Sequence, residues 1–81
     1  MSELSRGVRG TQQELVTEKN IASALGSGGL AVYATPCMIT LMEYCAMESV
    51  KQLLPAGSST VGTRLDVKHL AATPIGMTVR C

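Results

Sequence analysis

The segment from Thr35 to about Leu54 constrains the fold most, because its apolar residues recur with the period of an α-helix. Projected on a helical wheel, one stripe collects Met38, Leu41, Met42, Cys45, Ala46, Ser49, Val50 and Leu53. Thr35 is expected to cap the helix through its side-chain oxygen, and Pro36 suits the first helical position, where no N–H is needed. The pattern therefore predicts a helix that ends near Leu54, before Pro55, with one face toward a core.

Strands are expected on both sides of this helix. Residues 11–17 suggest a short strand, which a Gly/Ser-rich turn separates from the helix. Residues 60–72 alternate in polarity, which predicts a half-buried strand with His69 on the apolar side. Residues 77–81 begin another alternating strand that stops soon after its start. We therefore expect one α+β domain over residues 1–81 whose C-terminal strands are missing.

Composition narrows the partners and the compartment. A chain of 81 residues buries only a small core, so a second copy is expected to cover the helix, giving a homodimer or a higher homo-oligomer. The three cysteines form no CxxC pair and suggest neither a disulfide framework nor a metal site, which fits the cytoplasm. No apolar run approaches about 20 residues, so no membrane span is expected. A net charge of +1 without a basic cluster argues against nucleic-acid binding.

Three residues admit more than one interpretation. Glu43 lies at the margin of the helix stripe, where it is either a solvated edge carboxylate or a partly desolvated working group. His69 is the sole histidine, and it is either a core histidine bonded to a backbone carbonyl or a catalytic group. Cys37 lies near the helix N-terminus, where the dipole lowers a thiol pKa, so a Cys37/His69 nucleophilic pair is a rival hypothesis.

A family resemblance bears on these alternatives. The sequence ATPCMITLMEYCAM at residues 34–47, followed by VGTRLDVKHLAATPIGMTV at residues 61–79, resembles the fluoroacetyl-CoA thioesterase and its relatives, which are hotdog-fold acyl-CoA thioesterases. The similarity covers roughly residues 30 to 80. It implies a hotdog fold, in which a central helix packs on an antiparallel sheet, with this chain stopping after the start of the third strand. It also implies a thioester hydrolase that acts on a small acyl-CoA.

The same resemblance implies a set of site residues. It assigns catalysis to Thr35, Glu43 and His69 and substrate binding to Gly62. Pro36 and Cys37, at the helix start, are also expected to bind substrate, and no metal or cofactor is expected. Glu43 would either attack the thioester directly or draw a proton from water, and both routes stay open. His69 would be the proton shuttle, while backbone N–H groups at the helix start would polarise the carbonyl. The alternative function is a non-catalytic acyl-CoA-binding or structural hotdog subunit.

Helix geometry adds a condition on this site. The helix rises about 12 Å between Thr35 and Glu43, so the two side chains cannot touch within one straight helix. Since hotdog dimers place their sites at the subunit interface, Thr35 of one chain is expected to approach Glu43 of the other, unless the first turn is irregular. The family closes its acyl pocket with a lid that bears phenylalanine, whereas this chain has none. Specificity for the fluoroacetyl group is therefore not expected.

Overall fold

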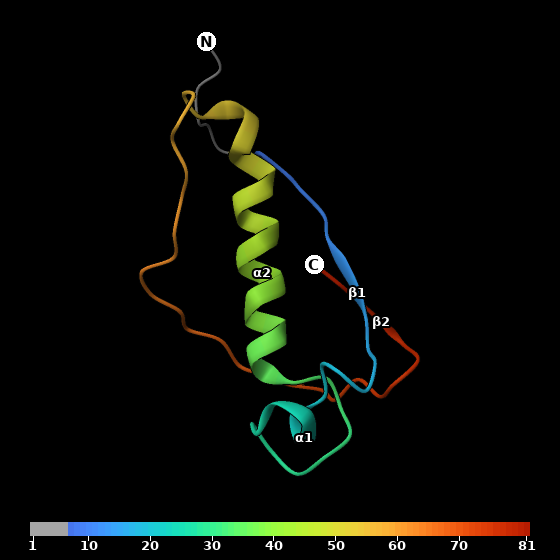
Figure 1. Cartoon of the computed structure of the whole chain (residues 1–81). Coiled ribbons are helices and arrows are strands. Elements are labelled where there is room, and N and C mark those ends of the chain that lie inside the picture. The colour runs from blue at the N-terminus through green and yellow to red at the C-terminus, as the bar shows by residue number, and fades with distance from the viewer. Residues whose placement is uncertain (1–6) are drawn as a thin grey trace.

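One long helix stands beside a two-stranded antiparallel sheet in the structure, a computed structural model that describes residues 7–81 (Figure 1). The elements in chain order are β1 (Gln13–Leu15), α1 (Ala22–Leu25), α2 (Thr35–Val50), a 3₁₀ turn (Lys51–Leu53) and β2 (Thr78–Arg80). Neither of the α-helices in this described part is long and apolar enough to cross a membrane. The predicted strands at residues 11–17 and 77–81 are confirmed as β1 and β2.

The central helix α2 begins differently from the prediction. Ala34, and not Thr35, is the N-cap residue, and no side chain caps the helix. Ala34 has an extended backbone and its N–H bonds to the Asn20 carbonyl at 2.9 Å, which holds it outside the helix. Thr35 is therefore the first helical residue, and its hydroxyl is free to bond elsewhere. The end agrees with the prediction, because the 3₁₀ turn continues α2 to Leu53, shortly before Pro55.

The sheet joins segments that are far apart in the sequence. Glu14 lies opposite Val79 at the centre of the antiparallel register, with Gln13 opposite Arg80 and Leu15 opposite Thr78. Two further backbone bonds between Gln12 and Cys81, both 2.8 Å, extend the pairing beyond the strands. The sheet is therefore held by continuous backbone hydrogen bonds.

The core lies between this sheet and the first half of α2. Val16, Ile21 and Tyr33 form the buried cluster, and Cys37, Met38 and Val79 pack against it. Further along α2, Leu41 and Cys45 are the buried residues. Met42 and Ala46 are exposed, so the buried stripe of the helix is narrower than the sequence predicts.

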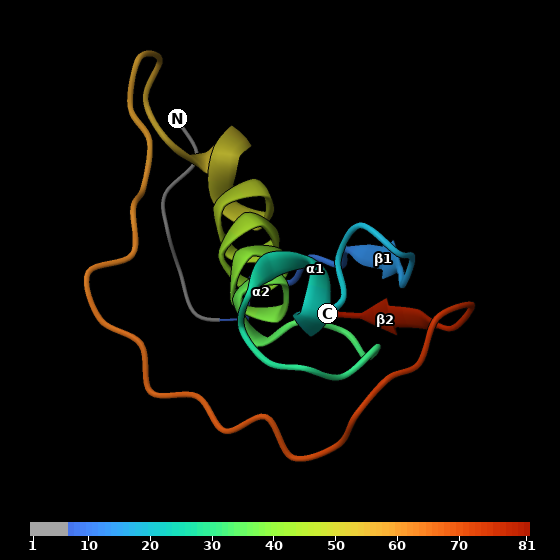
Figure 2. The same cartoon turned by 60° about the horizontal axis from the view of Figure 1, so that its bottom comes forward.

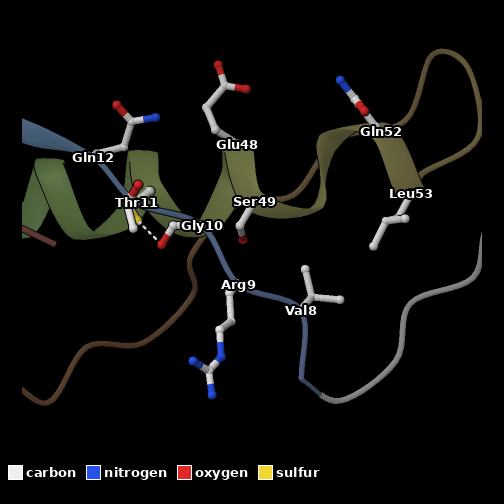
Figure 3. Close-up of a pocket in the computed structure, with 10 residues that line it drawn as sticks. Val8, Arg9, Gly10, Thr11, Gln12, Glu48, Ser49, Gln52 and Leu53 are labelled. Atoms are coloured by element: carbon white, nitrogen blue, oxygen red, sulfur yellow. Dashed lines mark hydrogen bonds between the residues drawn. The ribbon is translucent and has the colours of Figure 1, made fainter.

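The segment before β1 crosses the second half of α2. The Cys45 thiol donates to the Gly10 carbonyl at 3.4 Å and lies 3.5 Å from the Cys81 carbonyl. A Cβ atom on Gly10 would lie 2.5 Å from the Ser49 Cβ, so only glycine allows this approach; Figure 3 shows the two residues against each other. A groove of about 430 Å³ opens here, and its lining includes Arg9, Glu48 and Gln52.

The predicted strand at residues 60–72 is wrong. We call residues 54–72 the connecting segment; it contains no helix or strand and arcs away from the rest of the molecule (Figure 2). Within the described chain, no backbone–backbone hydrogen bond involves residues 59–72, so no neighbouring strand pairs with them. Within residues 59–72 only Val67 and His69 are partly buried, whereas Val61 and Leu70 are 86% and 87% exposed. The alternating pattern is real, but a strand also needs a partner.

Candidate functional site

Thr35 and His69 meet at the start of α2. The Thr35 hydroxyl and the His69 Nδ1 atom are 2.7 Å apart, which is a hydrogen bond between side chains. The hydroxyl donates when Nδ1 carries no proton and accepts when it does. His69 thus bonds to a threonine and not to a backbone carbonyl. The two residues line a cavity of about 240 Å³. The other lining residues come from three places in the chain, namely residues 22 and 27, residues 32–33, and residues 70–72.

Glu43 and Gly62 meet two turns further along α2. A Cβ atom built on Gly62 would lie 2.6 Å from the Glu43 Oε2 atom, so the Gly62 backbone lies directly against the carboxylate. Both residues line a groove of about 660 Å³ with apolar walls that include Met42 and Val61. Glu43 is exposed, so the desolvation expected from its place at the stripe margin is absent in the single chain.

The two pairs do not form one site within a chain. Thr35 and His69 line one cavity, and Glu43 and Gly62 line another. Along a regular helix the rise from Thr35 to Glu43 is about 12 Å, and α2 is helical through its first turn. Thr35 and Glu43 therefore each have one candidate partner on the connecting segment, and the two pairs are separated along the helix axis.

Pro36 and Cys37 line a third cavity, of about 330 Å³, on another side of α2. Burial, and next the nearby Glu14 charge, raise the pKa of the Cys37 thiol. This direction is opposite to the one expected from the helix dipole, and it disfavours the thiolate form of Cys37. His69 does not line this cavity, which removes the geometric basis for a Cys37/His69 pair.

Glu14 and Tyr33 form a polar pair that the sequence interpretation missed. The buried Tyr33 hydroxyl donates a hydrogen bond to the Glu14 Oε1 atom. Burial, then this bond and the carboxylate charge, raise the pKa of Tyr33 above its ordinary value. The period of a strand indicates the position of Glu14. Glu14 shares one face of β1 with the flanking Gln12 and Val16, and this face is less exposed than the opposite face. No group of three or more metal-binding side chains occurs within residues 7–81.

Comparisons with known proteins agree on one family. The family model described as "FlK: Fluoroacetyl-CoA-specific thioesterase" matches residues 16–81. The fluoroacetyl-CoA thioesterase of Streptantibioticus cattleyicolor is 42% identical over 48 residues, which are 59% of this chain and 34% of that protein.

Solved structures of the fluoroacetyl-CoA thioesterase FlK are similar in three dimensions. A threonine-to-alanine variant in complex with fluoroacetate gives a TM-score of 0.83 at 29% identity, with 95% of this chain and 62% of that chain covered. A phenylalanine-to-alanine variant in complex with fluoroacetate and CoA gives a TM-score of 0.79 at 31% identity, with 89% of this chain and 61% of that chain covered. The chain thus spans less than two thirds of the length of these relatives.

Proposed function

We propose that this chain, which belongs to the fluoroacetyl-CoA-specific thioesterase family and carries the central helix of its hotdog fold, serves to hydrolyse a small acyl-CoA thioester. The observation that carries the proposal is the contact between Glu43 and the Gly62 backbone, beside a groove large enough for a ligand. The family match over residues 16–81 supports the reaction class, and the relative with bound CoA supports the substrate class.

Glu43 is the proposed catalytic carboxylate. Hydrolysis adds water across the thioester C–S bond and gives a carboxylic acid and the CoA thiol. Glu43 either attacks the carbonyl carbon, forming an anhydride that water then opens, or removes a proton from the attacking water. The Gly62 backbone, which lies against the carboxylate, is proposed to hold the thioester through its N–H group.

His69 is the proposed proton shuttle, and Thr35 its positioning partner. A hydrogen bond from one ring nitrogen fixes the orientation and tautomer of an imidazole, which leaves the other nitrogen for proton transfer. The 2.7 Å bond between Thr35 and Nδ1 supports this division of roles. The Nε2 atom would then deliver the proton to the departing thiolate. Pro36 and Cys37 are proposed to bind substrate from the first turn of α2, where the Cys37 backbone N–H group attracts a carbonyl oxygen and Pro36, which has no N–H, contributes contacts of its ring.

The complete site is proposed to form in a homodimer. In one chain, Thr35–His69 and Glu43–Gly62 line different cavities, and the exposed Met42 and Tyr44 beside Glu43 leave apolar surface for a second chain. Thr35 and His69 of one subunit would then approach Glu43 of its partner.

The chain contains no phenylalanine, so we propose no specificity for fluoroacetyl-CoA. Free thiols at all three cysteines support action in the cytoplasm.

The test of the reaction is thiol release from acyl-CoA by the Glu43→Gln variant. This change keeps the shape of the side chain but removes its charge, so turnover should fall at least about a hundredfold. Glu48→Gln is the matched control, because Glu48 lies on the same helix outside the Glu43 groove. Near-normal turnover in Glu43→Gln would mean that Glu43 is a solvated carboxylate at the edge of the helix stripe, without a catalytic role. CoA binding without turnover in the wild type would favour a non-catalytic binding subunit.

The shared site has a separate test in mixed dimers. An inactive Thr35→Ala chain and an inactive Glu43→Gln chain, exchanged in equal amounts, should form mixed dimers with one intact site each. Recovery should approach about a quarter of wild-type activity for random pairing. Verified subunit exchange without any recovery would place Thr35 and Glu43 in the same chain's site.

A further inference from the structure

The cavity beside Pro36 contains a polar feature that thioester hydrolysis does not require. We call this cavity of about 330 Å³ the Glu14 pocket; its lining includes Leu25, Pro36, Cys37, Leu41 and Tyr44, together with Gln12, Gln13, Glu14 and Thr40. Its volume is at the small end of ligand sites, which suits a short chemical group. Most of its wall is apolar, and Glu14 is the single charged residue in the lining.

Glu14 is held in place from the core. Tyr33 is 2% exposed, does not line the pocket, and donates its hydroxyl hydrogen bond to Oε1 of Glu14. The backbone of Glu14 is fixed as well, because it lies in β1 opposite Val79. A carboxylate with a fixed backbone and one fixed hydrogen bond presents its remaining acceptor in a defined direction, which is what recognition of a polar group requires.

The second carboxylate oxygen of Glu14 can still accept hydrogen bonds. Among the residues that the structure describes, Glu14 belongs to no ion pair, and its one side-chain hydrogen bond is the bond from Tyr33. Cys37 and Tyr44 are the other ionisable side chains in the pocket lining, and both are neutral; burial and then the Glu14 charge raise the pKa of the Cys37 thiol. A carboxylate with open acceptor positions beside apolar walls favours a ligand that brings a hydrogen-bond donor.

The Glu14 pocket adjoins the groove of the proposed catalytic carboxylate. Thr40 and Tyr44 line both the Glu14 pocket and the Glu43 groove. A thioester held at Glu43 could therefore extend its acyl group past these two residues into the Glu14 pocket. The phosphates of CoA would not fit this site, because a carboxylate repels anions.

We infer that the Glu14 pocket binds the acyl group of the substrate and selects acyl groups that carry a hydroxyl or ammonium hydrogen-bond donor, with Glu14 as the acceptor. This inference rests on the proposed thioesterase function and adds a substrate class to it. Tyr33 acts as a positioning residue, because it holds the carboxylate and does not reach the ligand. A site built around an acceptor discriminates against an acyl group that lacks the donor, since the carboxylate is then desolvated without a partner.

The experiment compares matched acyl-CoA pairs on the protein as it is expressed. Butyryl-CoA and 3-hydroxybutyryl-CoA differ by one hydroxyl, and propionyl-CoA and β-alanyl-CoA differ by one ammonium group. At least one donor-bearing member should show a kcat/KM about tenfold above that of its partner, and the pair that does so distinguishes hydroxyl from ammonium recognition. Glu14→Gln should bring that ratio close to one, and because the ratio is taken within a pair, a change in turnover common to both members cancels. Glu18→Gln, an exposed carboxylate outside the pocket, is the matched control.

Each outcome bears on one claim. Equal rates for both pairs in the wild type, or a preference that survives Glu14→Gln, would overturn the inference while leaving the thioesterase function in place. Tyr33→Phe, which removes the hydrogen bond that holds Glu14, should also bring the ratio within that pair closer to one. If no thioester is hydrolysed, the proposed function fails, and equilibrium binding of the same pairs decides the inference alone. Tighter binding of the donor-bearing member then supports it, and equal binding overturns it.

Discussion

Thr35 and Glu43 lie on α2, whereas Gly62 and His69 lie on the connecting segment, which has no helix or strand. The helical pair is positioned by repeated backbone bonds and by the buried Leu41 and Cys45. The other pair depends on isolated contacts, namely one hydrogen bond to Thr35 and one close approach to Glu43. One half of the candidate site is thus built into regular structure, and the other half is held against it. Changes in the two regions should therefore affect different properties of the protein.

The largest expected difference concerns stability. Leu41→Ala removes a buried side chain from α2 and should lower the free energy of unfolding by about 2–5 kcal/mol. Leu70→Ala makes the same chemical change in the connecting segment, where the side chain is exposed, and should change it by no more than about 0.5 kcal/mol. Urea unfolding of both variants measures the difference. Equal destabilisation would mean that the connecting segment is packed in solution.

A smaller effect is expected on activity from Gly62→Ala. Gly62 does not have a positive φ, so alanine fits its backbone, but the new Cβ would meet the flexible end of Glu43 at 2.6 Å. We expect the carboxylate to move, with turnover about tenfold lower and the unfolding midpoint nearly unchanged. Gly29→Ala is the matched control, because a Cβ there meets nothing within 4 Å. Unchanged activity in Gly62→Ala would separate this contact from catalysis.

The smallest expected effect is on the attachment of the connecting segment to α2. Thr35→Val keeps the side-chain shape and removes the bond to His69, which is worth about 0.5–1 kcal/mol at an exposed position. Tryptic cleavage after Arg64 and Lys68 should then accelerate about threefold, because cleavage follows the population of the detached segment. Thr63→Val, an exposed threonine without this bond, should leave the rate unchanged. Unchanged cleavage in Thr35→Val would show that the bond does not hold the segment.

Local patterns predicted the elements that depend on local interactions. Pro36 and the apolar period of the following residues were sufficient for α2, and polar–apolar alternation was sufficient for β1 and β2. The same alternation predicted a strand at residues 60–72, which is wrong because a strand also needs a neighbour, and no local pattern states whether one is present. The cap on Thr35 is wrong for a similar reason. Asn20, far away in sequence, bonds Ala34 and moves the helix start.

The candidate site residues came from the family resemblance, and the contacts between them were not predicted. Nothing local brings Thr35 to His69 or Gly62 to Glu43, since each contact joins α2 to a segment with no regular structure. Cys37 shows the limit of arguing from one element, because the helix dipole was considered, whereas burial and next the Glu14 carboxylate, which raise the pKa of its thiol, were not. Glu14 comes from β1, and its position relative to Cys37 exists only once the sheet packs on the helix.

The β1–β2 register also bears on the order of folding. Residues 13–15 pair with residues 78–80, so the sheet can form only after a loop containing α2 and the connecting segment has closed. Helical bonds in α2 join residues four apart and need no such closure. Loop closure costs entropy before it gains contacts, and proteins with distant contacts fold slowly for this reason. The helix is therefore available early as a surface for docking, and Tyr33, only 19 residues from Glu14, can reach its partner through a much shorter loop than the one that the two strands must close.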